Sequence, residues 1–172
     1  MKKRVSLWLL ASLAVLSVAV QSCKDDEDED PQPNPEFVAD NNTFKDFMNW
    51  PLVATNFGAD PALGMAHAGN DSTVTRRIYI KDNKSAVNGE YPVGTLIVKH
   101  SFDQAGNVDE YTAMVKRGNE FSPTGGDWEW FMLMPDGSIA QDNGMPMRGA
   151  DLMGGMCAAC HTAATTDFVF SK

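Results

Sequence analysis

Cysteine and basic residues are both scarce in this sequence, and each shortage excludes a class of protein. Only three of the 172 residues are cysteines, which is too few for a fold held together by disulfides, and the number is odd. Fourteen Lys and Arg stand against 23 Asp and Glu, for a formal net charge of -9. Proteins bind nucleic acid by neutralising its phosphates with Lys and Arg, so we expect no nucleic-acid partner. The length is typical of one domain.

Long apolar runs are also scarce, and the longest is shorter than an ordinary membrane span. Residues 5–20 are apolar apart from serines and follow a basic N-terminal segment, which is typical of a secretory signal peptide. Residues 21–23, Gln-Ser-Cys, resemble the lipobox of bacterial lipoproteins, in which cleavage precedes a cysteine that carries the lipid. We therefore predict a signal peptide over residues 1–22 and a lipid anchor at Cys23. A retained anchor helix is the alternative.

The segment after the proposed anchor is predicted to be a solvated tether. Six consecutive acids at residues 25–30 repel one another, and the prolines that follow resist a helix. We interpret residues 23–36 as an extended linker, although the acidic run also resembles an export address of some surface-exposed lipoproteins. The protein is thus expected to be exported and anchored to a membrane, on the periplasmic side or facing the outer-membrane or cell surface. Residues 37–172 then form the functional domain.

This domain is predicted to be α+β and mainly β. Residues 44–50 carry apolar positions at helical spacing, which predicts a short helix, whereas residues 56–71 are rich in Gly, Ala, Asp and Asn and predict a loop. We expect a further helix around the C-terminal cysteines, and residues 168–170 as a short strand or a tail packed on the core. Four runs of β-branched and aromatic residues predict an antiparallel sheet of four or five strands: residues 74–80, 95–102, 110–116 and 128–134.

The clearest motif is C-x-x-C-H at Cys157, Cys160 and His161, the attachment pattern of c-type haem. Two thiols on one helical turn reach the two vinyl groups of one haem, and the imidazole that follows ligates the iron. Three alternatives remain. A thioredoxin-like pair needs a βαβ setting, a zinc site needs further ligands such as His67 or His100, and a disulfide at this spacing is strained. We expect one covalently attached haem c.

The sixth coordination position of such an iron is predicted to be open. The residues after His161 contain neither Met nor His, so they offer none of the usual axial ligands. An upstream ligand is the alternative, but methionines more often fill a core, and lone histidines more often lie at the surface or in hydrogen bonds. The upstream candidates are Met145, Met147, Met153, Met156, His67 and His100.

The motif and the strand runs together resemble the cytochrome P-460 family, which includes the cytochromes c′-beta. The helical-bundle cytochromes c′ also end in C-x-x-C-H, but they need four long helices. The resemblance implies a largely antiparallel β-fold, commonly dimeric, with an otherwise five-coordinate haem c. It extends through most of residues 44–172 and is carried by residues 76–80 (RRIYI), 94–99 (GTLIVK), 113–116 (AMVK), 128–131 (WEWF), 157–161 (CAACH) and 167–170 (DFVF).

The resemblance also implies roles for three residues outside the motif. Family enzymes that oxidise hydroxylamine carry a lysine cross-linked to the haem edge in a G-T-x-x-V-K segment, and Lys99 falls on it; on a strand it shares a face with Ile97 and Thr95. A solvated lysine that protects a sheet edge is the alternative. Where those enzymes have a distal glutamate, this chain has Thr112, which is no general base near neutral pH. Arg76 matches a family arginine near the distal side, or else lies at the surface.

Three functions follow from these features. The first is a lipid-anchored haem c protein with five-coordinate iron that binds or converts a small nitrogen-oxide ligand such as nitric oxide. The second is an oxidoreductase acting on hydroxylamine or nitric oxide, with a lysine–haem cross-link and an external redox partner. The third is an electron-transfer cytochrome c. The missing carboxylate weakens the second, so we expect the first, in a homodimer.

Overall fold

The computed structural model describes residues 35–59 and 71–170, which belong to one unit, Pro33–Lys172. The predicted signal peptide, the anchor candidate Cys23, most of the tether and His67 lie outside the described residues. Among the helices of the described part, none is long and apolar enough to cross a membrane.

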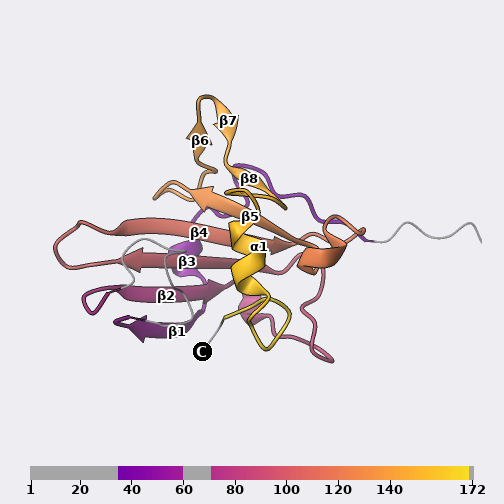
Figure 1. Cartoon of the computed structure of the whole chain (residues 1–172), viewed down its shortest axis with the longest axis horizontal. Helices are drawn as coiled ribbons and strands as arrows, with labels where there is room; N and C mark the ends of the chain where they lie inside the picture. The colour runs from indigo at the N-terminus through magenta and orange to yellow at the C-terminus, as the bar shows by residue number, and fades with distance from the viewer. Residues whose placement is uncertain (1–34, 60–70, 171–172) are drawn as a thin grey trace, which may run out of the picture. The chain divides into compact units, whose positions relative to one another are not determined.

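A six-stranded antiparallel sheet forms the centre of this unit (Figure 1). Five strands that follow one another in the chain are also neighbours in the sheet, and the sixth pairs with the fifth. A separate two-stranded hairpin projects beyond the edge of the sheet where β8 lies (Figure 1). The sheet consists of β1 (Leu52–Phe57), β2 (Thr75–Ile80), β3 (Leu96–Phe102), β4 (Asp109–Lys116), β5 (Trp128–Leu133) and β8 (Arg148–Gly149), and the hairpin of β6 (Gln141–Asp142) and β7 (Met145–Pro146).

Helical structure is limited to short pieces. The predicted helix over residues 44–50 is wrong in extent, because only Phe47–Asn49 forms a 3₁₀ turn, η1. Asp46 before it has a left-handed backbone with φ 56°, which an α-helix excludes. Phe44 and Phe47 are nevertheless buried, so their spacing reflects contact with the core. The other pieces are η2 (Lys81–Asn83), η3 (Pro123–Gly125) and α1 (Met156–His161).

The predicted fold class is confirmed: the domain is mainly β, with an antiparallel sheet and a helix at the cysteines. The four predicted strands match β2 to β5 to within one residue at each end. The predicted loop over residues 56–71 is wrong at its start, since Asn56 and Phe57 belong to β1. This edge strand is exposed or half-buried throughout and lacks the apolar alternation that identifies a strand. Residues 168–170 form a tail with Val169 buried.

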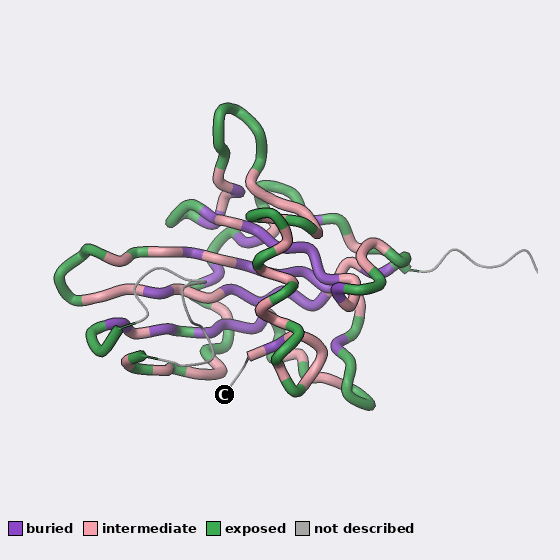
Figure 2. Tube along the Cα trace, in the orientation of Figure 1, coloured by how far each residue is buried: buried purple, intermediate pink, exposed green. Residues whose placement is uncertain are grey.

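The two faces of the sheet carry different cores, because side chains alternate along each strand. On the face that we call the back face, Tyr79, Val98 and Val115 pack against Phe44 and Phe47 from the segment before β1. The tube in Figure 2 shows the buried positions concentrated in the middle of the strands, with exposed residues at the turns. The back face is therefore closed by the chain's own N-terminal segment.

The opposite face, which we call the pocket face, is covered differently. Ile78, Ile97, Met114 and Trp130 form its core, and side chains from α1 and the C-terminal tail pack against them. In Figure 1, α1 crosses in front of the central strands on this side. The segment before β1 packs only on the back face, so the six-residue helix α1 and the C-terminal tail cover the pocket face.

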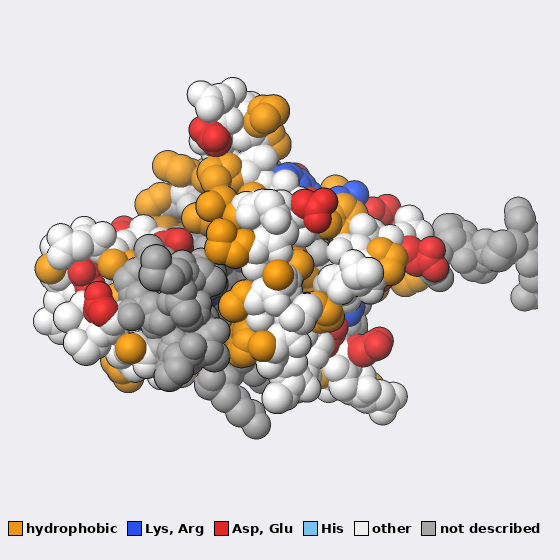
Figure 3. Space-filling view, viewed as in Figure 1, with side chains coloured by type: hydrophobic (Ala, Val, Ile, Leu, Met, Phe, Trp, Pro, Cys, Tyr) orange, Lys and Arg blue, Asp and Glu red, His pale blue; other side chains and the backbone are white. Residues whose placement is uncertain are grey.

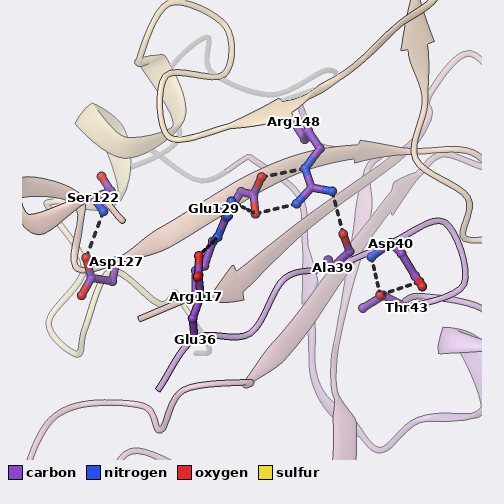
Figure 4. Close-up of polar contacts among 9 residues, drawn as sticks. All are labelled: Glu36, Ala39, Asp40, Thr43, Arg117, Ser122, Asp127, Glu129 and Arg148. Atoms are coloured by element: carbon purple, nitrogen blue, oxygen red, sulfur yellow. Dashed lines mark hydrogen bonds and ion pairs between the residues drawn. The ribbon is translucent and has the colours of Figure 1, made fainter. Parts of the chain in front are cut away.

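On the back face, the buried carboxylate of Glu129 and two arginines connect β5 with β8 and with the segment before β1 (Figure 4). Glu129 is 2% exposed and accepts hydrogen bonds from Arg148 Nε at 2.7 Å and Nη2 at 2.8 Å, and from Arg117 Nη1 at 3.2 Å. Arg148 also donates to the Ala39 carbonyl at 2.7 Å, and Arg117 to Glu36 at 2.8 Å. Because the carboxylate is paired with two guanidinium groups, its burial is compensated.

Candidate haem-binding site

The C-x-x-C-H motif lies on α1, at the one place where the chain folds into an α-helix among the described residues. Two glycines precede the helix, and Gly155 at its start has φ 80°, a left-handed backbone that glycine adopts without strain. The helical rise then places Cys157 one turn before His161. The helix packs on β5, so the motif faces the pocket face of the sheet.

A pocket opens between α1 and the pocket face. Cys157 and His161 line it on the helix side, and the strands β2 to β5 contribute the opposite wall. The lining is mainly apolar, and Figure 3 shows hydrophobic side chains gathered over α1 and next to it. From the sheet, the apolar part of the wall comes from Ile78, Ile97, Met114, Trp130 and Met132.

His161 is oriented by contacts on more than one side. Its Nδ1 lies 2.6 Å from the carbonyl oxygen of Phe168. A carbonyl can only accept, so Nδ1 carries the proton and Nε2 is the nitrogen with the lone pair. The ring also lies 4.5 Å from the Trp130 ring and 5.2 Å from the Phe170 ring, between centroids. This is the arrangement of a metal-ligating histidine, whose second nitrogen is held by a carbonyl.

The two cysteines fit haem attachment better than the alternative chemistries. Both are present as thiols in the structure. Burial raises the pKa of the Cys157 thiol, whereas a redox-active cysteine needs a lowered pKa. The zinc alternative does not gain a ligand from His100, because that ring stacks on Tyr111 at 4.3 Å on the back face. Within the described residues, no group of three or more His, Cys, Asp and Glu could hold a metal ion.

Lys99 and Thr112 meet inside the pocket. They are direct partners in the pairing of β3 with β4, so their side chains leave the sheet on the same face, and both line the pocket. The expectation that Lys99 shares this face with Ile97 agrees with the lining. Burial lowers the pKa of Lys99 to about 8, against 10.5 for an ordinary lysine. A fraction of this lysine is therefore a neutral amine near neutral pH.

Arg76 lines the same pocket and is not a surface residue. Its side chain is buried, at 4% exposure, and lines the pocket from β2. Its guanidinium donates a hydrogen bond to the Gly58 carbonyl just after β1. This contact fixes the position of the positive charge next to Lys99, whose pKa it helps to lower.

Glu110 is a residue that the sequence analysis missed. It lies two positions before Thr112 on β4, and therefore on the same face, opposite the buried Ser101 of β3. Its charge acts on both Lys99 and Cys157, raising the pKa of each. Position 112, where the family enzymes have a glutamate, is a threonine in this chain. The alternation of side chains along β4 predicts that Glu110 lies on the same face.

The methionine candidates for a sixth ligand separate in the structure. Met145 is 71% exposed on the hairpin strand β7, and Met153 and Met156 are also exposed. Met114 and Met132, which the sequence analysis did not single out, do line the pocket. Among the described residues, Met114 and Met132 are therefore the methionines that could provide a sixth ligand from the pocket wall.

Comparison with known proteins agrees with this geometry. The family model described as Cytochrome P460 matches residues 44–171, which is about three quarters of the chain. The match begins at Phe44 on the back face and includes the pocket wall, the C-x-x-C-H helix and the C-terminal tail. No curated protein and no solved structure matches the chain.

Proposed function

Because the chain belongs to the cytochrome P460 family, whose members are haem c proteins acting on nitrogen compounds, we propose that it holds one covalent haem c and binds nitric oxide or a similar ligand. The Cys157 and Cys160 thiols would add across the haem vinyl groups, forming C–S bonds while the thiol protons pass to carbon. His161 Nε2 would ligate the iron. When bound, the haem supplies an iron that binds small nitrogen oxides.

The observation that carries this proposal is the pairing of Lys99 with Thr112 in the pocket wall. Both groups are able to donate hydrogen bonds, and Arg76 adds a fixed positive charge in the pocket wall. A nitrogen-oxide ligand carries partial negative charge on its outer atom, which such donors stabilise in an apolar pocket. The threonine hydroxyl and the protonated fraction of Lys99 cannot remove a proton from the ligand, which favours binding over oxidation.

The haem itself is tested first. Protein matured by haem c machinery should keep its haem after denaturation and give the pyridine haemochrome of a thioether-bonded haem. A high-spin spectrum at rest supports five-coordinate iron with an open position. A low-spin resting spectrum would contradict the open position and favour the electron carrier, with Met114 or Met132 as the ligand to substitute next. Absence of haem would overturn the whole proposal.

The pocket donors are tested by the dissociation rate of nitric oxide from the ferrous protein. Each hydrogen bond to the ligand stabilises the complex by about 1 kcal/mol, so Lys99→Met and Thr112→Val should each dissociate nitric oxide roughly fivefold faster. The matched controls are Lys45→Met and Thr124→Val, which change exposed residues outside the pocket. Equal rates in all four variants would remove the donors from the mechanism.

Oxidation of hydroxylamine is the second candidate, because the lowered pKa of Lys99 and the nearby Glu110 favour it. Hydroxylamine would give nitric oxide, three protons and three electrons, with Glu110 as a proton acceptor and an external redox protein as the electron acceptor. A Lys99–haem bond would replace an N–H and a C–H bond by an N–C bond, with two electrons passing to a peroxide. Mass spectrometry of protease digests tests this bond, since a haem peptide that lacks the Lys99 segment excludes it.

We also propose that the protein is an exported lipoprotein and a homodimer. The support is the sequence pattern around Cys23 and the family resemblance. The Cys23→Ser variant should move from the membrane fraction to the soluble fraction and lose labelling by a fatty-acid probe. Light scattering on the purified haem domain should give twice the mass of one chain. Unchanged membrane association of the variant, or a monomeric mass, would overturn the corresponding part.

A further inference from the structure

The hydrogen bond that His161 Nδ1 donates to the Phe168 carbonyl involves a segment with no regular secondary structure. Asp167 and Phe168 both have a positive φ, 43° and 64°, which residues other than glycine rarely adopt. Such a backbone persists only where surrounding contacts fix it. On one side the Phe168 ring packs closely against Gly126, where an added Cβ would lie 2.7 Å from it. Further contacts come through Asp167.

Asp167 is bound to three separate parts of the sheet and its loops. Both carboxylate oxygens accept hydrogen bonds from Lys116 Nζ of β4 at 2.9 Å, and Oδ2 also accepts from the Tyr91 backbone N–H at 2.7 Å. The Asp167 carbonyl accepts from Trp128 Nε1 of β5 at 2.8 Å. This residue therefore connects the C-terminal tail to the rigid strands.

The Lys116–Asp167 ion pair is buried, which makes it different from an ordinary surface pair. The side chains are 10% and 5% exposed, and the ammonium lies 5.4 Å from the centre of the Trp128 ring. Neither side chain lines the haem pocket. A buried pair with its hydrogen bonds made is rigid, because moving either charge would leave the other uncompensated.

We propose that this ion pair positions the iron ligand: it holds the turn at residues 167–168 so that the Phe168 carbonyl keeps its hydrogen bond to His161 Nδ1. An acceptor at Nδ1 makes the imidazole more basic, so this contact strengthens the bond from Nε2 to iron. Lys116 and Asp167 are therefore positioning residues. The inference rests on the haem attachment proposed above and adds a means by which the fold sets ligand strength.

The test compares Lys116→Met with Asp167→Asn in haem-loaded protein. The readouts are the iron–histidine stretching frequency of the ferrous form, by resonance Raman spectroscopy, and the reduction potential. We expect both variants to lower the frequency and to raise the potential, because a weaker ligand stabilises ferric iron less. A through-space effect of charge on the iron would instead shift the potential in opposite directions, since one variant removes a positive charge and the other a negative charge.

Two further variants and the haem content complete the test. Glu36→Gln breaks a different ion pair, with Arg117, and should leave both readouts at the parent values. The double variant Lys116→Met with Asp167→Asn leaves no unpaired buried charge, so it replaces any single variant that does not fold, and should show the same shifts. Parent frequency and potential in the loaded variants would overturn the positioning role. Loss of haem from the parent protein would instead overturn the proposed function, and the haem content separates the two failures.

Discussion

The two faces of the sheet are built from the same strands but differ in what they bury. The back face buries aromatic rings in edge-to-face contact, such as Phe47 with Tyr79 at 5.6 Å and with Tyr111 at 5.9 Å, and its carboxylate Glu129 is paired. The pocket face instead holds Lys99 and Arg76 in an apolar pocket under one short helix. Because successive side chains on a strand point to opposite faces, one face can stabilise the domain while the other holds charged groups whose burial lowers stability.

The largest expected effect is the loss of covalent haem from the pocket face while the back face stays folded. Cys157→Ser with Cys160→Ser should abolish covalent haem, because no thiol is left on α1 to form a thioether. The sheet should still fold, since the aromatic contacts of the back face are untouched. Haem staining of a denaturing gel and circular dichroism measure the two properties. Haem that survives denaturation in this variant would show that attachment does not use the motif.

The converse change should damage stability and spare the pocket. Phe47 is 1% exposed and lies between two tyrosine rings, so Phe47→Ala should lower the free energy of unfolding by about 3–5 kcal/mol. The folded fraction should keep the parent haem spectrum. Urea titration measures the loss, with Phe57→Ala as the control, since that side chain is 75% exposed on β1. Equal losses in both variants would contradict the role given to the back face.

Lys99 provides a test of how much a buried positive charge on the pocket face lowers the stability of the protein. Its pKa is about 8 in the folded protein, against 10.5 for an ordinary lysine, so the unfolded chain binds more protons between these pH values. The free energy of unfolding should therefore rise with pH from about 8 to 10.5, by up to about 3 kcal/mol. Lys99→Met should remove this rise and stabilise haem-free protein at pH 7. A rise that persists in the variant would belong to another group.

The sequence predicted the strands better than the contacts between them. The runs that became β2 to β5 are rich in β-branched and aromatic residues because both faces of the sheet are buried, and this composition is a local property of the sequence. Likewise, C-x-x-C-H predicts its own helix. By contrast, β1 at the edge of the sheet buries little, and its last two residues resemble the loop that follows.

Contacts between distant segments could not be predicted in this way. That Lys99 lies opposite Thr112 depends on the register of two strands, which is set by the turn between them. The pairing of Lys116 with Asp167 joins residues 51 positions apart and leaves no periodic pattern in the sequence. Glu110 is different, because its place on the same face as Thr112 follows from the alternation of side chains along β4.

The smallest expected effect concerns the paired charge of the back face. Glu129→Gln keeps the shape of the side chain and one acceptor oxygen, but it removes the negative charge shared by Arg117 and Arg148. Because both arginines are partly exposed and regain water, we expect a loss of only about 1–2 kcal/mol in the free energy of unfolding. Chemical denaturation measures it, and the haem spectrum and nitric oxide dissociation rate should stay at the parent values. A changed dissociation rate would show that the two faces are coupled, because Glu129 does not line the pocket.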